Sequence, residues 1–190
     1  MVRINQNFLW SVCLFLLCAC TSEDNLQNSF LERTATIRLS ISGETSDVFS
    51  HIESKISIIQ GFRFEDGVLE ECYDHLLPDE TGTFRLQPSQ MRGTVYFLAN
   101  ASDIVAKAGF KLGITTLDDF LSLKAMSDEM TSEGVVMAGK TELDEGKKSL
   151  SVILKRSVSR IDLDSSFEGV QVNEILIKGI SPNGYVNERE

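Results

Sequence analysis

The stretch Gly93-Thr-Val-Tyr-Phe-Leu-Ala99 is the most apolar run in the body of this chain. An apolar run of this length, with β-branched and aromatic residues, is typical of a central strand that is buried on both faces. The stretch Thr34-Ala-Thr-Ile-Arg-Leu-Ser-Ile-Ser42 alternates instead, and places Ile37, Leu39 and Ile41 on one face. This alternation predicts a half-buried strand. The two stretches indicate a mainly β body.

Further strands are expected where apolar residues recur between turn residues. They are predicted at 54–61 with an extension to 64, and at 83–86, 135–137, 150–163 and 170–178. The long segment 150–163 changes phase near Arg156, which predicts a bulge or a strand that crosses from one sheet to another. About seven to nine short strands indicate a β-sandwich or a barrel. The side chains expected to point inward are Ile37, Leu39, Val95, Phe97, Ile153 and Ile175.

Two short helices are predicted between these strands. Thr116-Leu-Asp-Asp119 resembles a capping box in which Asp replaces Glu. Leu117, Phe120, Leu121 and Lys124 then follow at helical spacing, with the apolar face ending at the stem of the lysine. A second short helix is expected over 103–108.

Composition limits the classes of function. The chain has 190 residues, of which 42% are hydrophobic and 24% charged, and its net charge is −10. This length suits one domain, and the negative charge disfavours nucleic acid as a partner. We find no nucleophile elbow, phosphate-binding loop or paired-carboxylate motif, so we expect neither an enzyme nor a cofactor.

The first residues have the pattern of an export signal. Residues 1–7 carry one positive charge, Arg3, and no acid, and residues 8–19 are almost all apolar. About twelve helical residues measure roughly 18 Å, which is too short for a bilayer core of about 30 Å. We therefore predict a signal peptide at 1–19, with a buried helix as the less favoured alternative.

The end of this run, Leu17-Cys18-Ala19-Cys20, resembles a bacterial lipobox. That pattern places an apolar residue and two small ones before a cysteine whose sulfur accepts a diacylglycerol. We expect the signal peptidase to cut between Ala19 and Cys20, and Cys20 to carry S-diacylglycerol and N-palmitoyl groups. Cys18 is the alternative lipid carrier, but Leu17 directly before it fits the pattern less well. Residues 20–33 then form a lipidated, largely polar tether.

The remaining candidates for chemistry are few. Cys72 is the one cysteine of the body, and we expect it to be a buried or half-buried small residue. An intermolecular or catalytic role for its thiol is the alternative. The histidines are His51 and His75, and Cys72-Tyr-Asp-His75 is only a weak hint of metal binding. No metal site is therefore predicted.

Four segments resemble the fimbrillin superfamily of Bacteroidales, which builds type V pili. They are Thr94–Ala101 with its Ala-Asn-Ala end, Met130–Gly139, Leu154–Leu163, and the lipobox followed by a nearby arginine. The resemblance implies a transthyretin-like β-sandwich N-terminal domain over 34–190. Members of the family carry a second such domain; we expect it to be absent here, as in a truncated or minimal member.

The resemblance also implies a function in fimbriae. Stalk subunits of the family are cut after an arginine by an Arg-specific protease and polymerise by strand exchange, whereas anchor subunits keep their lipid. The candidate cleavage site here lies between Arg33 and Thr34. Because Arg33 is close to Cys20, we favour a surface-exposed anchor at the outer membrane whose partners are fimbrial subunits, with the major fimbrillin at the fibre base. The alternatives are a cleaved stalk or tip subunit, and a surface lipoprotein that binds glycan or peptide.

Overall fold

The computed structural model describes residues 33–42, 54–126, 134–158, 173–179, 181 and 183–187. These ranges form nine strands and two short helices. The strands are β1 (Ala35–Ile41), β2 (Ile59–Glu65), β3 (Val68–Tyr73), β4 (Thr83–Leu86), β5 (Thr94–Ala99), β6 (Lys124–Met126), β7 (Met137–Glu142), β8 (Ser149–Arg156) and β9 (Asn183–Tyr185). The helices are α4 (Ser102–Ala108) and α5 (Leu117–Leu121).

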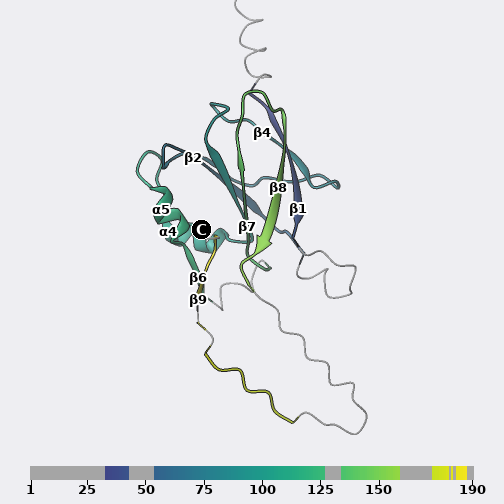
Figure 1. Cartoon of the computed structure of the whole chain (residues 1–190), viewed down its shortest axis with the longest axis vertical. Coiled ribbons are helices and arrows are strands. Elements are labelled where there is room, and N and C mark those ends of the chain that lie inside the picture. The colour runs from purple at the N-terminus through teal and green to yellow at the C-terminus, as the bar shows by residue number, and fades with distance from the viewer. Residues whose placement is uncertain are drawn as a thin grey trace, which may run out of the picture.

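Seven strands form one curled sheet in the order β3-β2-β5-β7-β8-β1-β4. The strand β1 lies between β8, to which it is parallel, and β4, to which it is antiparallel. The pairing of β7 with β8 is limited to Met137 with Arg156 and Ala138 with Lys155. The sheet folds over at this short join, so β1, β4 and β8 form one layer, and β2, β3, β5 and β7 form the other (Figure 1).

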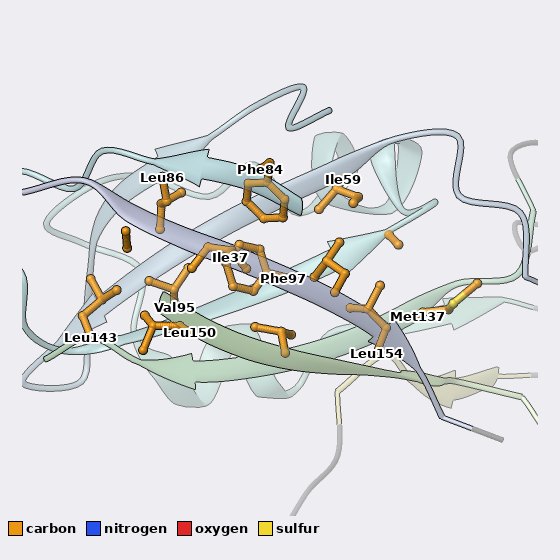
Figure 2. Close-up of a cluster of buried hydrophobic side chains, with 14 of the residues drawn as sticks. Ile37, Ile59, Phe84, Leu86, Val95, Phe97, Met137, Leu143, Leu150 and Leu154 are labelled. Atoms are coloured by element: carbon orange, nitrogen blue, oxygen red, sulfur yellow. The ribbon is translucent and has the colours of Figure 1, made fainter. Parts of the chain in front are cut away.

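The space between these two layers holds the first of two hydrophobic clusters (Figure 2). Ile37 of β1, Phe97 of β5 and Leu154 of β8 are fully buried there. The alternation of β1 explains its contribution, because successive side chains of a strand point to opposite faces. The core of a two-layer β-sandwich results.

The second cluster lies on the opposite face of β2 and β5, beneath the helices. The ring of Phe120 in α5 is fully buried, and its centroid lies 5.0–5.4 Å from those of Phe62, Phe64, Tyr96 and Phe110. The helix begins with the predicted capping box, in which Asp119 N donates to Thr116 Oγ1 at 3.2 Å and Thr116 N donates to Asp119 Oδ2 at 3.2 Å. Since a five-residue helix is unstable alone, this cap and the Phe120 anchor hold it in place.

The prediction of a mainly β sandwich with one or two short helices is confirmed. The strand β5 is buried on both faces, as its apolar run predicts, since Val95 and Phe97 face the first cluster while Tyr96 and Leu98 face the second. The helix predicted at 103–108 is present as α4. Lys124, predicted to end the helical face of α5, lies in β6 instead.

Two inward-facing predictions are wrong. Ile153 is 56% exposed because the inner face of β8 is set by its register with β1, which pairs Leu39 with Val152 and Ser40 with Ile153. Ile175 is 53% exposed, and residues 173–178 of the predicted last strand carry no strand pairing. Residues 159–163 and 170–172 of the predicted strands lie outside the described residues. The strand β9, which pairs with β6, was not among the predicted strands.

Among the helices that the described ranges contain, none has the length and apolar character needed to cross a membrane.

Candidate functional site

The predicted lipidation and signal-peptidase residues, Ala19 and Cys20, lie outside the described residues, as does the signal peptide. The predicted protease site lies just inside them. Arg33 is exposed, and its Nη1 donates a hydrogen bond to the backbone oxygen of Ser89 at 3.0 Å. This contact fixes the side chain of Arg33 against the loop between β4 and β5.

The chain enters the sandwich immediately after Arg33. Thr34 is half-buried and Ala35, which opens β1, is fully buried. The backbone nitrogen of Thr36 donates to the oxygen of Lys148 at 2.8 Å, which ties the start of β1 to the turn before β8. A cut between Arg33 and Thr34 would therefore leave every described strand in the remaining chain.

A buried arginine anchors the loop that receives Arg33. Arg63 of β2 is only 2% exposed. Its Nε and Nη2 lie 2.9 and 2.8 Å from Glu71 Oε1, and its Nη1 donates to Glu65 Oε2 at 2.7 Å and to the backbone oxygen of Arg92 at 3.2 Å. Glu71 in turn accepts hydrogen bonds from the backbone nitrogen and hydroxyl of Ser89. This Arg63 cluster thus joins β2, β3 and the β4–β5 loop.

The cluster keeps its two carboxylates ionised. Hydrogen bonding by Arg63 holds the pKa of Glu65 below its usual value. Burial acts to raise the pKa of Glu71, but the hydrogen bonds from Ser89 and Tyr73 and the charge of Arg63 outweigh it and lower that pKa. Burial and the neighbouring Glu71 raise the pKa of the Tyr73 hydroxyl, which donates to Glu71. The arrangement is suited to holding the loop, since each member already has a partner inside the cluster.

These lowered pKa values predict that stability falls in acid. A carboxyl whose pKa is lower in the folded state stabilises that state above its unfolded pKa, near 4.5 here, and this stabilisation is lost as the pH falls through the folded value. We expect the free energy of unfolding to be nearly level from pH 7 to about pH 5 and to decline below that. Glu71→Gln should cost about 1–3 kcal/mol at pH 7 and flatten the decline.

Urea unfolding at several pH values measures this prediction. Glu70→Gln is the matched control, because Glu70 is the exposed neighbour of Glu71 on the same strand. Equal pH profiles for Glu71→Gln and Glu70→Gln would contradict the role given to the cluster.

Cys72 and His75 do not form a catalytic or metal-binding group with other described residues. Cys72 is exposed, contrary to the prediction of a buried or half-buried residue; it lies near the end of the edge strand β3, where it pairs with Phe62. Partial desolvation and the charge of Asp74 raise the pKa of its thiol, which disfavours the reactive thiolate. His75 is exposed, His51 lies outside the described residues, and within the described ranges no three His, Cys, Asp or Glu residues are grouped as a metal would require.

A surface groove of about 530 Å³ lies where β7 and β8 separate. Its lining includes Lys140, Ile153, Lys155 and Arg156, together with Tyr185 of β9. Among the described residues that line the groove there is no carboxylate, although the whole chain has a net charge of −10. The lining thus combines the cationic side chains of Lys140, Lys155 and Arg156 with the exposed apolar side chain of Ile153.

Asn100, in the Ala-Asn-Ala end of the segment that resembles fimbrillins, is a structural residue. It is 2% exposed and adopts a φ of 57°. Its Oδ1 accepts from Ser57 N at 2.8 Å, and its Nδ2 donates to the oxygens of Lys55 and Val135 at 2.8 and 3.0 Å. The side chain thus joins three loops at one end of the sandwich, where asparagine tolerates the left-handed conformation better than most residues.

The fold and these contacts define a β-sandwich protein with an anchored N-terminal junction. Among solved structures, it is similar to a fimbrilin from Porphyromonas gingivalis, with 14% identity and a TM-score of 0.42 over 65% of this chain and 39% of that one. A candidate cell adhesion protein from Bacteroides eggerthii matches with 18% identity, a TM-score of 0.42 and the same coverage. Another from Parabacteroides distasonis matches with 18% identity and a TM-score of 0.44 over 66% of this chain and 40% of that one.

The chain thus spans about two fifths of the length of these solved structures. No functional conclusion follows from a likeness at this level. Comparison with protein-family models found no match, and comparison with curated proteins found none.

Proposed function

We propose that this chain is a structural lipoprotein of fimbriae, which lipid on Cys20 holds at the outer surface of the outer membrane and which anchors the fibre base. In this role it binds neighbouring fimbrial subunits and carries out no reaction. The proposal rests on the lipobox Leu17-Cys18-Ala19-Cys20 and on the resemblance of three body segments to fimbrillins.

The junction at Arg33 is the observation that favours an anchor over a cleaved stalk or tip subunit. A stalk subunit needs the cut to open a slot for a strand from its neighbour. Here β1 begins two residues after Arg33 and is paired on both sides, so loss of the preceding residues would not vacate any position in the described sheet. The anchor needs no such slot, because its N-terminal segment serves only to connect the domain to the lipid.

Binding of peptide or glycan is the second candidate, and the groove between β7 and β8 is the surface that favours it. Its cations match an acidic peptide. A row of exposed aromatic rings would favour glycan, but Tyr96 is largely buried and Lys140 Nζ lies 6.0 Å from the centre of its ring.

We expect Cys20→Ala to abolish labelling by a fatty-acid probe, to leave unprocessed precursor, and to release polymerised fimbriae into the medium. The thiol is the group to which lipid is attached, so without it the domain cannot be held at the outer membrane by lipid, while its fold is unchanged. Labelling, intact mass from outer membranes and electron microscopy of shed fibres measure the three effects.

Cys18→Ala is the matched control and should retain labelling, since alanine is also small. Undiminished labelling of Cys20→Ala would refute the assignment and indicate Cys18. A mature wild-type chain that starts at Thr34 would instead support the cleaved stalk subunit.

A further inference from the structure

We infer that the peptide bond between Arg33 and Thr34 is closed to proteases once β1 has joined the sheet, so that a cut at this position has to precede folding. This inference goes beyond the proposed function and does not depend on lipid attachment. It rests on Arg33 and on residues 34–37, all of which are described.

The backbone that directly follows the bond is already paired with neighbouring strands of the sheet. A protease holds several residues on both sides of the bond as an extended strand in its own cleft, which is why cuts occur in exposed, unpaired segments. Here Ala35 pairs with Leu86 of β4, and Thr36 pairs with both Arg85 of β4 and Ser149 of β8. A protease would have to bond to the same backbone N–H and C=O groups of β1 that β4 and β8 already bind.

Burial of the side chains also keeps this segment out of a protease cleft. Ala35 and Ile37 are both fully buried in the core between the two layers. To place the residues after Arg33 in a protease cleft, Ile37 would have to leave this core and be exposed to water. The exposed position of Arg33 itself is therefore not sufficient for cleavage.

The Arg33 side chain is also held. A protease specific for arginine must take the guanidinium into its pocket, but Arg33 Nη1 donates to the backbone oxygen of Ser89 at 3.0 Å. Ser89 is in turn fixed by hydrogen bonds to Glu71 of the Arg63 cluster. This hydrogen bond hinders cleavage less than the pairing and burial of β1 do.

Cleavage of the folded protein would thus need β1 to separate from both neighbours. Openings that disrupt interior strands are among the rarest in a native protein, and cleavage through such an opening follows its small population. Before β1 pairs, by contrast, the bond lies in an extended chain, and hydrolysis adds hydroxyl from water to the carbonyl carbon of Arg33 and hydrogen to the nitrogen of Thr34. The state of β1 therefore decides whether this site can be processed.

Two insertion variants of the full-length chain, purified in detergent, test the inference. The first has a six-residue Gly-Ser spacer between Arg33 and Thr34, which moves the bond after Arg33 away from β1. The matched control has the same spacer between Glu32 and Arg33, which keeps that bond next to β1. Both are treated with trypsin, and the product cut after residue 33 is followed by mass spectrometry.

We expect the first variant to be cut after Arg33 at least about thirtyfold faster than the control variant and the wild type, as local opening predicts. Wild-type protein that is unfolded in urea before a trypsin pulse should be cut after Arg33 at least about a hundredfold faster than the native protein. This second measurement needs no variant to fold. Equal rates in the two variants, or equal rates in native and unfolded wild type, would overturn the inference.

Discussion

Val152→Asp is expected to unfold the domain or to lower its free energy of unfolding by about 4 kcal/mol or more. Val152 is fully buried on the inner face of β8, opposite Leu39 of β1. An aspartate there would place a carboxylate in the apolar core between the two layers, where ionisation is strongly unfavourable. Circular dichroism during thermal and urea unfolding measures the loss.

Ile153→Asp is the matched control for this prediction. Ile153 is the next residue of the same strand but points to the other face, where it is 56% exposed and lines the groove that also contains Lys140 and Lys155. We expect its free energy of unfolding to change by less than about 1 kcal/mol. If the two substitutions had equal effects, or if Ile153→Asp were the more damaging, the register of β8 would be wrong.

Gly93→Ala is expected to cost about 3 kcal/mol or more, although it adds a single methyl group. Gly93 precedes β5 and has a φ of +87°, and a Cβ built there would lie 2.3 Å from the backbone oxygen of Phe64. The strand β2 would have to move away, which would also disturb Arg63 and its carboxylate partners. Urea unfolding of the variant measures the cost.

Gly67→Ala separates the steric effect from the backbone effect. Gly67 has a similar φ of +78°, but an added Cβ would have no atom within 4 Å. We expect a cost of only about 1 kcal/mol there, from the left-handed conformation itself. A Gly93→Ala protein as stable as the Gly67→Ala protein would contradict the close approach of Gly93 to β2.

The elements that the sequence predicts best are those with local causes. The capping box at Thr116 depends on residues three positions apart, and β5 depends on an apolar run that needs no partner to be recognised. The short helix α4 (Ser102–Ala108) was also predicted from local sequence. Local patterns of this kind are independent of how the chain is arranged at long range.

Two kinds of feature were missed. The error at Ile153 was avoidable, because Leu150, Val152 and Leu154 alternate with Ser149, Ser151 and Lys155, and Ile153 is the one apolar residue on the outer face of β8. The other missed features depend on pairing between distant segments. The Arg63 cluster needs β2, β3 and the β4–β5 loop together. Its one local signal is the arginine between Phe62 and Phe64, followed at the same-face spacing by Glu65. The exposure of Cys72 was also missed, and edge position alone does not explain it, since Leu69 of the same edge strand is fully buried.

The parallel pairing of β1 with β8 has a consequence for synthesis and export. The two strands are the first and the eighth along the described chain, so their pairing has a high contact order and cannot form until β8 has been delivered. If the chain crosses a membrane from its N-terminus, β1 emerges early and waits while most of the sandwich follows it. Throughout that interval the edge of β1 that later pairs with β8 remains open, even if β4 has already paired with the other edge. The length of the interval is set by the rate of translocation rather than by the stability of the finished domain.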